Sequence, residues 1–189
     1  MYLIKKDVHM ETIINLGIWE NKNYHFDWEN KVLLEETSSP NYWSYILLPV
    51  TLYTINKISD ILAEAGIFNN QLVRVGAVPI LGVLSYFLAA LIIRFYHGTL
   101  KLKKLELGEE QSKKFVRSLK RKRGYFKCLL NLFRILTVVA ILLFVFGNET
   151  IAVLFLAVSF LVIFMFKFDY QLNRWLKIIK IVEKGEKNV

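Results

Sequence analysis

The residues that could perform acid, base or metal chemistry are few and lie far apart. The three histidines, His9, His25 and His97, occupy three different segments. A metal site needs ligands that converge, and no zinc-type spacing is present. Cys128 is the only cysteine, so neither an internal disulfide nor a thiolate cluster can form. We therefore expect no metal and no cofactor, and we expect the histidines at the protein surface or at a membrane interface.

Two pairs of carboxylates are the candidates for general acid and base catalysis. Asp27 stands close to Glu29, and Glu35 precedes Glu36. Turn-forming residues lie nearby, and carboxylates in such places are commonly solvated charges. The sequence contains no glycine loop of the nucleotide-binding types and no GxSxG nucleophile elbow. It thus predicts no catalytic residue and no enzyme.

Long apolar runs must position any functional residue. Residues 75–93 provide 19 uncharged positions and residues 150–166 provide 17. Both runs approach the length of about 20 residues that a helix needs to cross a bilayer. Residues 128–147 form a further span, which Arg134 interrupts. Residues 42–55 are short for a span, and we expect them to form either the first span or a re-entrant or surface helix. The sequence predicts an all-α polytopic membrane protein with about four transmembrane helices.

The charge is distributed as membrane orientation requires. Residues 94–127 contain twelve Lys or Arg and three Glu, a net charge of +9. Lys and Arg near span ends stay in the cytoplasm, so this basic loop is expected inside the cell. An even number of spans then places the N- and C-termini in the cytoplasm too. Because predicted spans flank the loop on both sides, we expect no nucleic-acid partner.

The basic loop includes a helix-compatible segment, 109–122, with a narrow apolar stripe of Phe115, Val116 and Leu119. Basic amphipathic segments beside a membrane tend to lie on anionic head groups. An arginine inside a span is expected to snorkel toward the interface or to pair inside the bundle. The candidate membrane-surface residues are Lys120, Arg121, Lys122, Arg123 and Arg134.

The first 40 residues have a different pattern. Residues 13–19 are rich in β-branched and aromatic side chains, and residues 24–28 alternate aromatic and polar ones. With turn-forming residues between them and a third apolar run at 32–34, they predict a small antiparallel hairpin or three-stranded meander. A partner can bind to such an aromatic unit. The candidate partner-binding residues are Trp19, Tyr24, Phe26, Trp28 and Trp43.

Three regions follow from these patterns. Residues 1–40 form a β-rich cytoplasmic or interfacial segment, and residues 41–168 form the membrane domain with the basic loop. Residues 169–189 form a basic tail, in which Trp175, Leu176, Ile178, Ile179 and Ile181 alternate with cations. We expect this tail to be a helix along the membrane interface.

The order of these features resembles a known family. A short unit, Tyr24-His25-Phe26-Asp27-Trp28, precedes an aromatic approach to the membrane, Tyr42-Trp43 with Pro49. Several spans and a charged tail follow. This arrangement resembles the tandem five-transmembrane family of small Gram-positive bacterial membrane proteins, although four spans are counted here. Members are encoded beside toxins that type VII secretion systems export, and some act as immunity proteins.

The resemblance implies a cell-membrane immunity protein that binds a membrane-active protein toxin in the bilayer and blocks pore assembly. The scarcity of ionisable groups inside the spans fits binding better than autonomous transport. Two other functions stay open. One is a non-catalytic membrane subunit of an export or ABC-type system, with the basic loop docking a cytoplasmic protein. The other is a membrane sensor whose N-terminal hairpin reads a ligand. A homo-oligomer is compatible with each.

Overall fold

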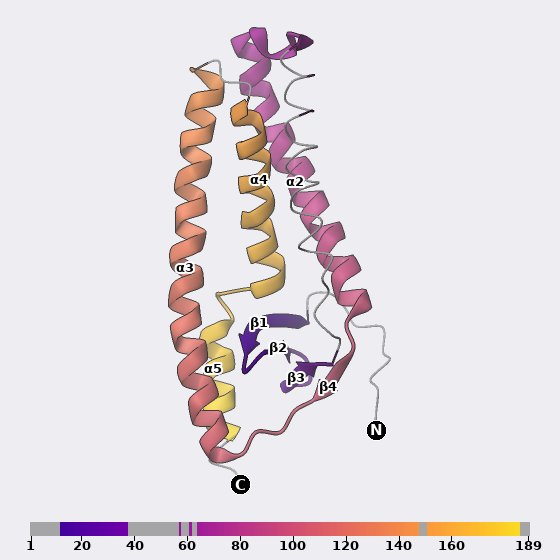
Figure 1. Cartoon of the computed structure of the whole chain (residues 1–189), viewed down its shortest axis with the longest axis vertical. Coiled ribbons are helices and arrows are strands. Elements are labelled where there is room, and N and C mark those ends of the chain that lie inside the picture. Colours follow the sequence, from indigo (N-terminus) through magenta and orange to yellow (C-terminus); the bar gives the residue numbers. More distant parts are fainter. Residues whose placement is uncertain (1–11, 38–56, 58–60, 62–63, 148–150, 186–189) are drawn as a thin grey trace. The chain divides into compact units, whose positions relative to one another are not determined.

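The computed structural model describes residues 12–37, 57, 61, 64–147 and 151–185, mostly as helices (Figure 1). The described chain divides into two compact units. The sheet unit contains residues 12–37, 90–130 and 165–185. The helix unit contains residues 57, 61, 64–89, 131–147 and 151–164. The sheet unit therefore combines parts of all three regions predicted from the sequence.

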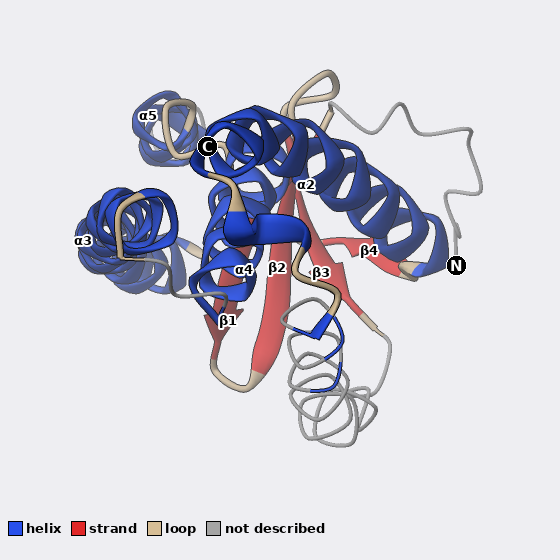
Figure 2. Cartoon of the chain, turned by 90° about the horizontal axis from the view of Figure 1, so that it is seen from above, coloured by secondary structure: helices blue, strands red, loops and turns tan. Residues whose placement is uncertain are grey.

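The sheet unit is built on four antiparallel strands in the order β1-β2-β3-β4 (Figure 2). The first three are β1 (Ile13–Trp19), β2 (Lys22–Asp27) and β3 (Val32–Glu36), joined by tight turns. They confirm the predicted three-stranded meander. β4 (Leu102–Lys104) comes from a distant part of the chain and pairs with β3. Three residues are too few to show strand alternation, so the sequence pattern did not indicate β4.

The sheet has two chemically different faces, and a β-bulge interrupts β1. The register with β2 shifts between Asn15 and Gly17, so the extra residue, Leu16, joins the same core as Ile14. Gly17 adopts φ 76°, a conformation that glycine reaches without strain. Its backbone N–H donates to Asn15 Oδ1 at 2.7 Å. Strand alternation thus directs Asn15 to one face while its apolar neighbours stay on the other, and the Gly17 N–H of the bulge holds the Asn15 amide.

The apolar face packs against the first part of α3 (Glu109–Val145) and against α5 (Trp175–Gly185). The predicted apolar stripe of α3 and the apolar side of the tail helix fill this core. The tail is helical as predicted, and its apolar side is buried against the sheet, while its place along the membrane interface stays a prediction. The sheet offers an equally apolar surface, and burial there removes the same side chains from water. The core residues are Ile14, Leu16, Tyr24, Phe26, Leu33, Phe115, Val116, Leu119, Trp175, Ile178 and Ile179.

Three helical stretches of the described chain are long and apolar enough to cross a membrane. They are Gln71–Thr99, which is α2, Glu109–Val145, which is α3, and Ile151–Glu183. The last begins with α4 (Ile151–Met165), which continues into the π-helical turn η2 (Phe166–Tyr170). These stretches contain the second, third and fourth predicted spans. The first predicted span, 42–55, lies outside the described residues.

The basic region 94–127 is not a loop, which corrects the sequence-based prediction. It comprises the end of α2, strand β4 and the first half of α3. α3 continues for 37 residues without a break, so the predicted helix 109–122 and the third span belong to one helix. No proline interrupts this stretch, and its Lys, Arg and Leu residues all favour the helix. The helix therefore continues without a break from the part that packs on the sheet into the part with an apolar surface.

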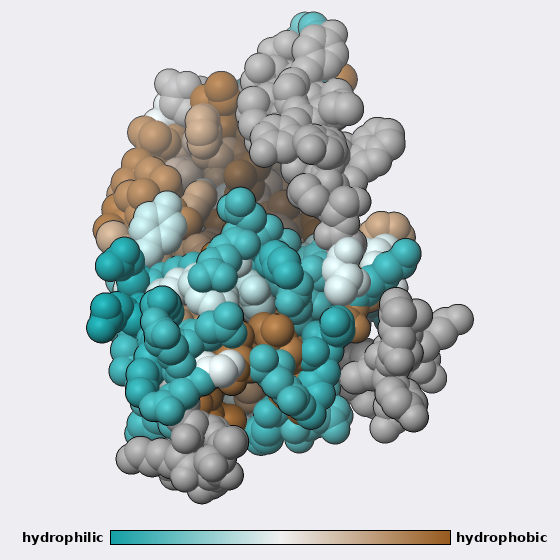
Figure 3. Space-filling view, turned by 60° about the horizontal axis from the view of Figure 1, so that its bottom comes forward, coloured by the Kyte–Doolittle hydropathy of each residue, from teal (hydrophilic) through white to brown (hydrophobic). Residues whose placement is uncertain are grey.

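The helix unit packs through small and polar residues. Gly82 lies beside the Phe160 ring, where an added Cβ would be 3.8 Å from Cε2. Ser85 Oγ donates to the carbonyl of Ala157 on α4 at 3.3 Å, a hydrogen bond between two helices. Outside such contacts the surface of the apolar helices is hydrophobic, whereas that of the sheet unit is mainly hydrophilic (Figure 3).

Candidate functional site

The polar face of the sheet carries the titratable groups that the structure brings together. We call this set the buried polar cluster. Its side chains come from all three meander strands, from the last turns of α2 and from η2. It consists of Asn15, Asn23, His25, Glu36, Tyr96, His97 and Asp169.

Asp169 is the centre of the first half of the cluster. This carboxylate is only 6% exposed. Its Oδ2 accepts a hydrogen bond from Asn15 Nδ2 at 2.9 Å, and its Oδ1 lies 3.0 Å from His97 Nε2. Because Asn15 Oδ1 holds the Gly17 N–H of the bulge, both ends of the Asn15 amide are used. The bulge, the π-helical turn and the end of α2 are therefore joined through one buried negative charge.

Glu36 is the centre of the second half. A single carboxylate oxygen, Oε2, lies 3.0 Å from Asn23 Nδ2 and 3.4 Å from His25 Nε2. The Tyr96 hydroxyl donates to the same atom, also at 3.4 Å. The two longer contacts are weak by hydrogen-bond criteria. They still place an imidazole and a phenol around a carboxylate whose side chain is 11% exposed.

Both imidazoles present Nε2 to a carboxylate, so we assign the proton of the neutral ring to Nε2. The Nδ1 atoms of His25 and His97 are buried and have no hydrogen-bond partner within the described residues. Tyr96 lies beside both rings, with centroid distances of 6.5 Å to His25 and 5.8 Å to His97. The two imidazole–carboxylate pairs and the Tyr96 ring therefore form one contiguous group on this face.

The burial of His25 and His97 corrects the expectation that the histidines lie at a surface. Strand alternation turns His25 to the polar face, opposite its core-facing neighbours. His97 is carried onto that face because α2 continues to Thr99, beyond the predicted span end at residue 93. His9 lies outside the described residues. The alternation of residues 24–28 was visible in the sequence, but the partners of the His25 side chain were not.

The carboxylates expected to be solvated divide into two groups. Asp27 is a turn residue, and its Oδ1 accepts from the backbone N–H groups of Glu29 and Asn30. Glu35 and Glu36 are mostly covered, so the prediction is wrong for them. Glu35 pairs with Lys22 at 2.6 Å, and this hydrogen bond and charge raise the pKa of Lys22. Tyr24 also has a raised pKa, chiefly because of burial and secondarily because of the Glu35 charge.

The predicted partner-binding aromatics mostly serve the core. Tyr24 and Phe26 are buried in it and cannot form a binding surface as the sequence suggested. Trp19 is half-buried, with its ring 5.1 Å from that of Phe115. Trp28 is partly exposed, and Lys31 Nζ lies 3.7 Å from its ring centroid. Trp43 lies outside the described residues.

The predicted membrane-surface cations have separate local roles. Lys120 pairs with Glu183 at 2.6 Å, and Lys122 donates to the Ile18 carbonyl. Arg121 is exposed and Arg123 is half-buried. Arg134 is exposed on the apolar part of α3, with Nη1 3.3 Å from Asn131 Oδ1 of the same helix. Contact of these residues with lipid head groups stays a prediction.

Arg74 is a functional candidate that sequence reasoning missed, because it resembled an ordinary cation at a span end. It is 6% exposed inside the helix unit. Its guanidinium donates to the carbonyls of Phe68, Asn69 and Phe144, the last two at 3.3 and 3.4 Å. Phe144 belongs to the last turn of α3, where carbonyls lack helical partners and favour a cation. Arg74 therefore fastens the start of α2 to the end of α3.

Within the described residues, no group of three or more His, Cys, Asp or Glu side chains is arranged to hold a metal ion. The buried polar cluster offers two imidazole–carboxylate pairs instead. Comparison with known protein families, with curated proteins and with solved structures finds no match to this chain. Its function must therefore be inferred from the residues and their geometry.

Proposed function

We propose that this chain is a non-catalytic membrane immunity protein, which protects its cell by binding a membrane-active protein toxin in the bilayer. The supporting observation is the large apolar surface that stays exposed on the described helices. Ile80 and Phe87 on α2 are each 61% exposed, and Phe155 on α4 is 64% exposed. Exposure of such side chains to water costs about 25 cal/mol per Å². Lipid, or a partner inserted in lipid, must cover them.

The ionisable groups of these helices favour binding over transport. A proton or ion pathway is usually marked by acidic, basic or imidazole side chains that face one another inside the spans. Arg74, beside one apolar run, is held by backbone carbonyls, and Arg134, within another, is held by a side-chain amide. Both have local structural partners. The proposal places the toxin-contact surface on the apolar helix faces.

The test is co-expression with a depolarising toxin encoded beside this gene, with growth and membrane potential as readouts. The proposal expects the toxin alone to depolarise cells and this chain to restore them. Phe87→Ala and Phe155→Ala form a matched pair, because both remove an exposed phenyl ring from an apolar helix. Loss of protection with one variant, at equal protein level, would locate the contact. An active toxin that the wild-type chain leaves unaffected would refute the proposal.

A membrane sensor is a second candidate, and the buried polar cluster is the observation that favours it. His25, His97 and the two carboxylates connect the sheet to the last turns of α2 and to η2. Hydrogen exchange of the full chain in lipid nanodiscs can test this reading. If the sheet transmits a signal to α2, the backbone amides of the Asp169→Asn variant should exchange faster both in β1 and in residues 90–99. Faster exchange in β1 alone would contradict the sensor function.

A further inference from the structure

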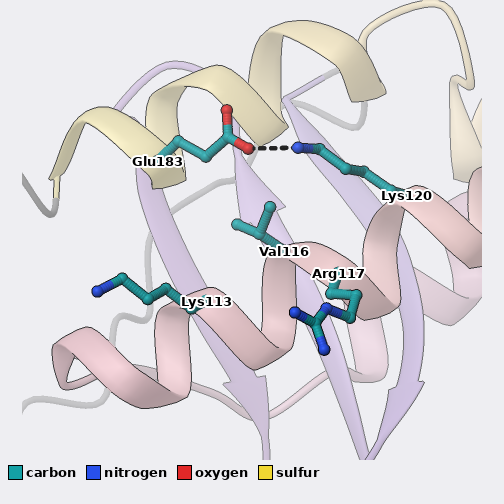
Figure 4. A pocket seen from close by; sticks show the side chains of 5 residues that line it. All are labelled: Lys113, Val116, Arg117, Lys120 and Glu183. Carbon is teal, nitrogen blue, oxygen red and sulfur yellow. Dashed lines mark hydrogen bonds and ion pairs between the residues drawn. The ribbon is translucent and has the colours of Figure 1, made fainter.

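A basic groove lies on the helices that cover the apolar face of the sheet. Its volume is about 260 Å³. Three cations of α3 line it at spacings of four and three residues, which places them along one side of that helix. α5 contributes one acid to its opposite wall (Figure 4). The lining residues are Lys113, Val116, Arg117, Lys120 and Glu183.

The cations of the groove differ in the partners that they already have. Lys120 Nζ lies 2.6 Å from Glu183 Oε1, which links the two walls. Lys113 pairs with Glu109 one turn earlier on α3. Arg117 is exposed and has no acidic partner in the part of the chain that the structure describes. The groove therefore presents, at Arg117, a guanidinium whose charge no described acid neutralises.

We propose that this groove binds an acidic segment of a partner protein on the soluble side of the membrane. The planar guanidinium of Arg117 can receive a carboxylate through two parallel hydrogen bonds, a geometry that lysine cannot provide. Lys113 extends the positive surface one turn along α3, and buried Val116 supplies an apolar wall for the stems of the bound side chains. The proposal does not depend on the immunity function, because the groove lies on the first half of α3, away from its apolar half.

The position of the groove along α3 favours a protein over lipid head groups. The apolar half of this helix begins near Leu129, twelve residues after Arg117. At about 1.5 Å per residue, this separation corresponds to about 18 Å along the helix. The head-group layer on each side of a bilayer is only about 5–8 Å thick. Arg117 and Lys113 therefore extend beyond that layer, into the space where a soluble segment can reach them.

The experiment uses the full chain in nanodiscs of zwitterionic phosphatidylcholine. The probe is a short fluorescein-labelled peptide of alternating glutamate and alanine, and binding is followed by anisotropy. We expect saturable binding that weakens as salt rises. Arg117→Glu should weaken it about tenfold, since reversal replaces attraction with repulsion. Arg117→Lys should give a smaller loss. The matched control, Lys127→Glu, makes the same charge change at an exposed position of α3 outside the groove.

Three results would overturn the proposal. The first is absence of peptide binding to the wild-type chain. The second is an equal loss with Arg117→Glu and Lys127→Glu, which would reduce the effect to net charge. The third concerns lipid. A bimane label at Arg117→Cys, in a Cys128→Ser background, should be quenched by neutral acrylamide equally in phosphatidylcholine and phosphatidylglycerol discs. Shielding in the anionic discs alone would assign the groove to the membrane surface.

Discussion

Replacing Asp169 with asparagine should destabilise the sheet unit by about 2–4 kcal/mol. The carboxylate is 6% exposed and lies 2.9 Å from Asn15 Nδ2 and 3.0 Å from His97 Nε2. Asparagine keeps the shape but has only one acceptor oxygen, so its amide group must face one of these donors. One hydrogen bond to a charged group is then lost, at about 1.5–3 kcal/mol, and a buried donor is left unpaired.

Tryptophan fluorescence can follow this change, because three of the four tryptophans, Trp19, Trp28 and Trp175, belong to the sheet unit. The full chain would be titrated with denaturant in a mild detergent, and the free energy of unfolding would be compared between variants. Glu110→Gln is the control. It also removes one carboxylate charge, but that side chain is 82% exposed in its pair with Lys114, so no measurable change is expected.

An Asp169→Asn variant that unfolds at the same denaturant concentration as this control would refute the reasoning. It would mean that Asp169 does not fasten the sheet to the end of α2. A second comparison tests the pairing itself. His97→Gln and Asp169→Asn should be non-additive, since both remove the same contact. Additive losses would show that the two side chains act independently.

Three further predictions follow from the geometry. Arg74→Met should lower the thermal stability of the detergent-solubilised chain by about 2–4 kcal/mol because it leaves buried carbonyls unpaired, whereas the exposed Arg94→Met should not. Gly17→Ala should cost about 1–2 kcal/mol in denaturant unfolding, because φ 76° strains alanine although its Cβ would have room, 3.7 Å from Phe126 Cζ. Burial raises the folded pKa of Tyr24, so its contribution to stability should disappear as pH rises above about 10. Tyr24→Phe should flatten that alkaline decline, and an unchanged pH profile would refute this assignment.

Local patterns in the sequence were sufficient for the strands and the apolar helices. β-Branched and aromatic residues at 13–19, alternation at 24–28, the apolar run at 32–34 and the turn-forming residues between them predicted β1, β2 and β3. The apolar runs predicted the helical stretches through length and lack of charge alone. Each of these patterns lies within a single helix or strand, so residues that are neighbours in the sequence are enough to recognise it.

Tertiary structure decided what each face meets. Asn15 and Asp169 are 154 positions apart, and only the packing of η2 on the polar face makes them partners. The stripe of Phe115, Val116 and Leu119 predicted an apolar contact, but lipid and the sheet satisfy such a stripe through the same removal of surface from water. The sequence by itself therefore determined which surfaces must be covered. The fold determined which surfaces cover one another, because hydrophobic burial is not directional and long-range polar pairs form only after it.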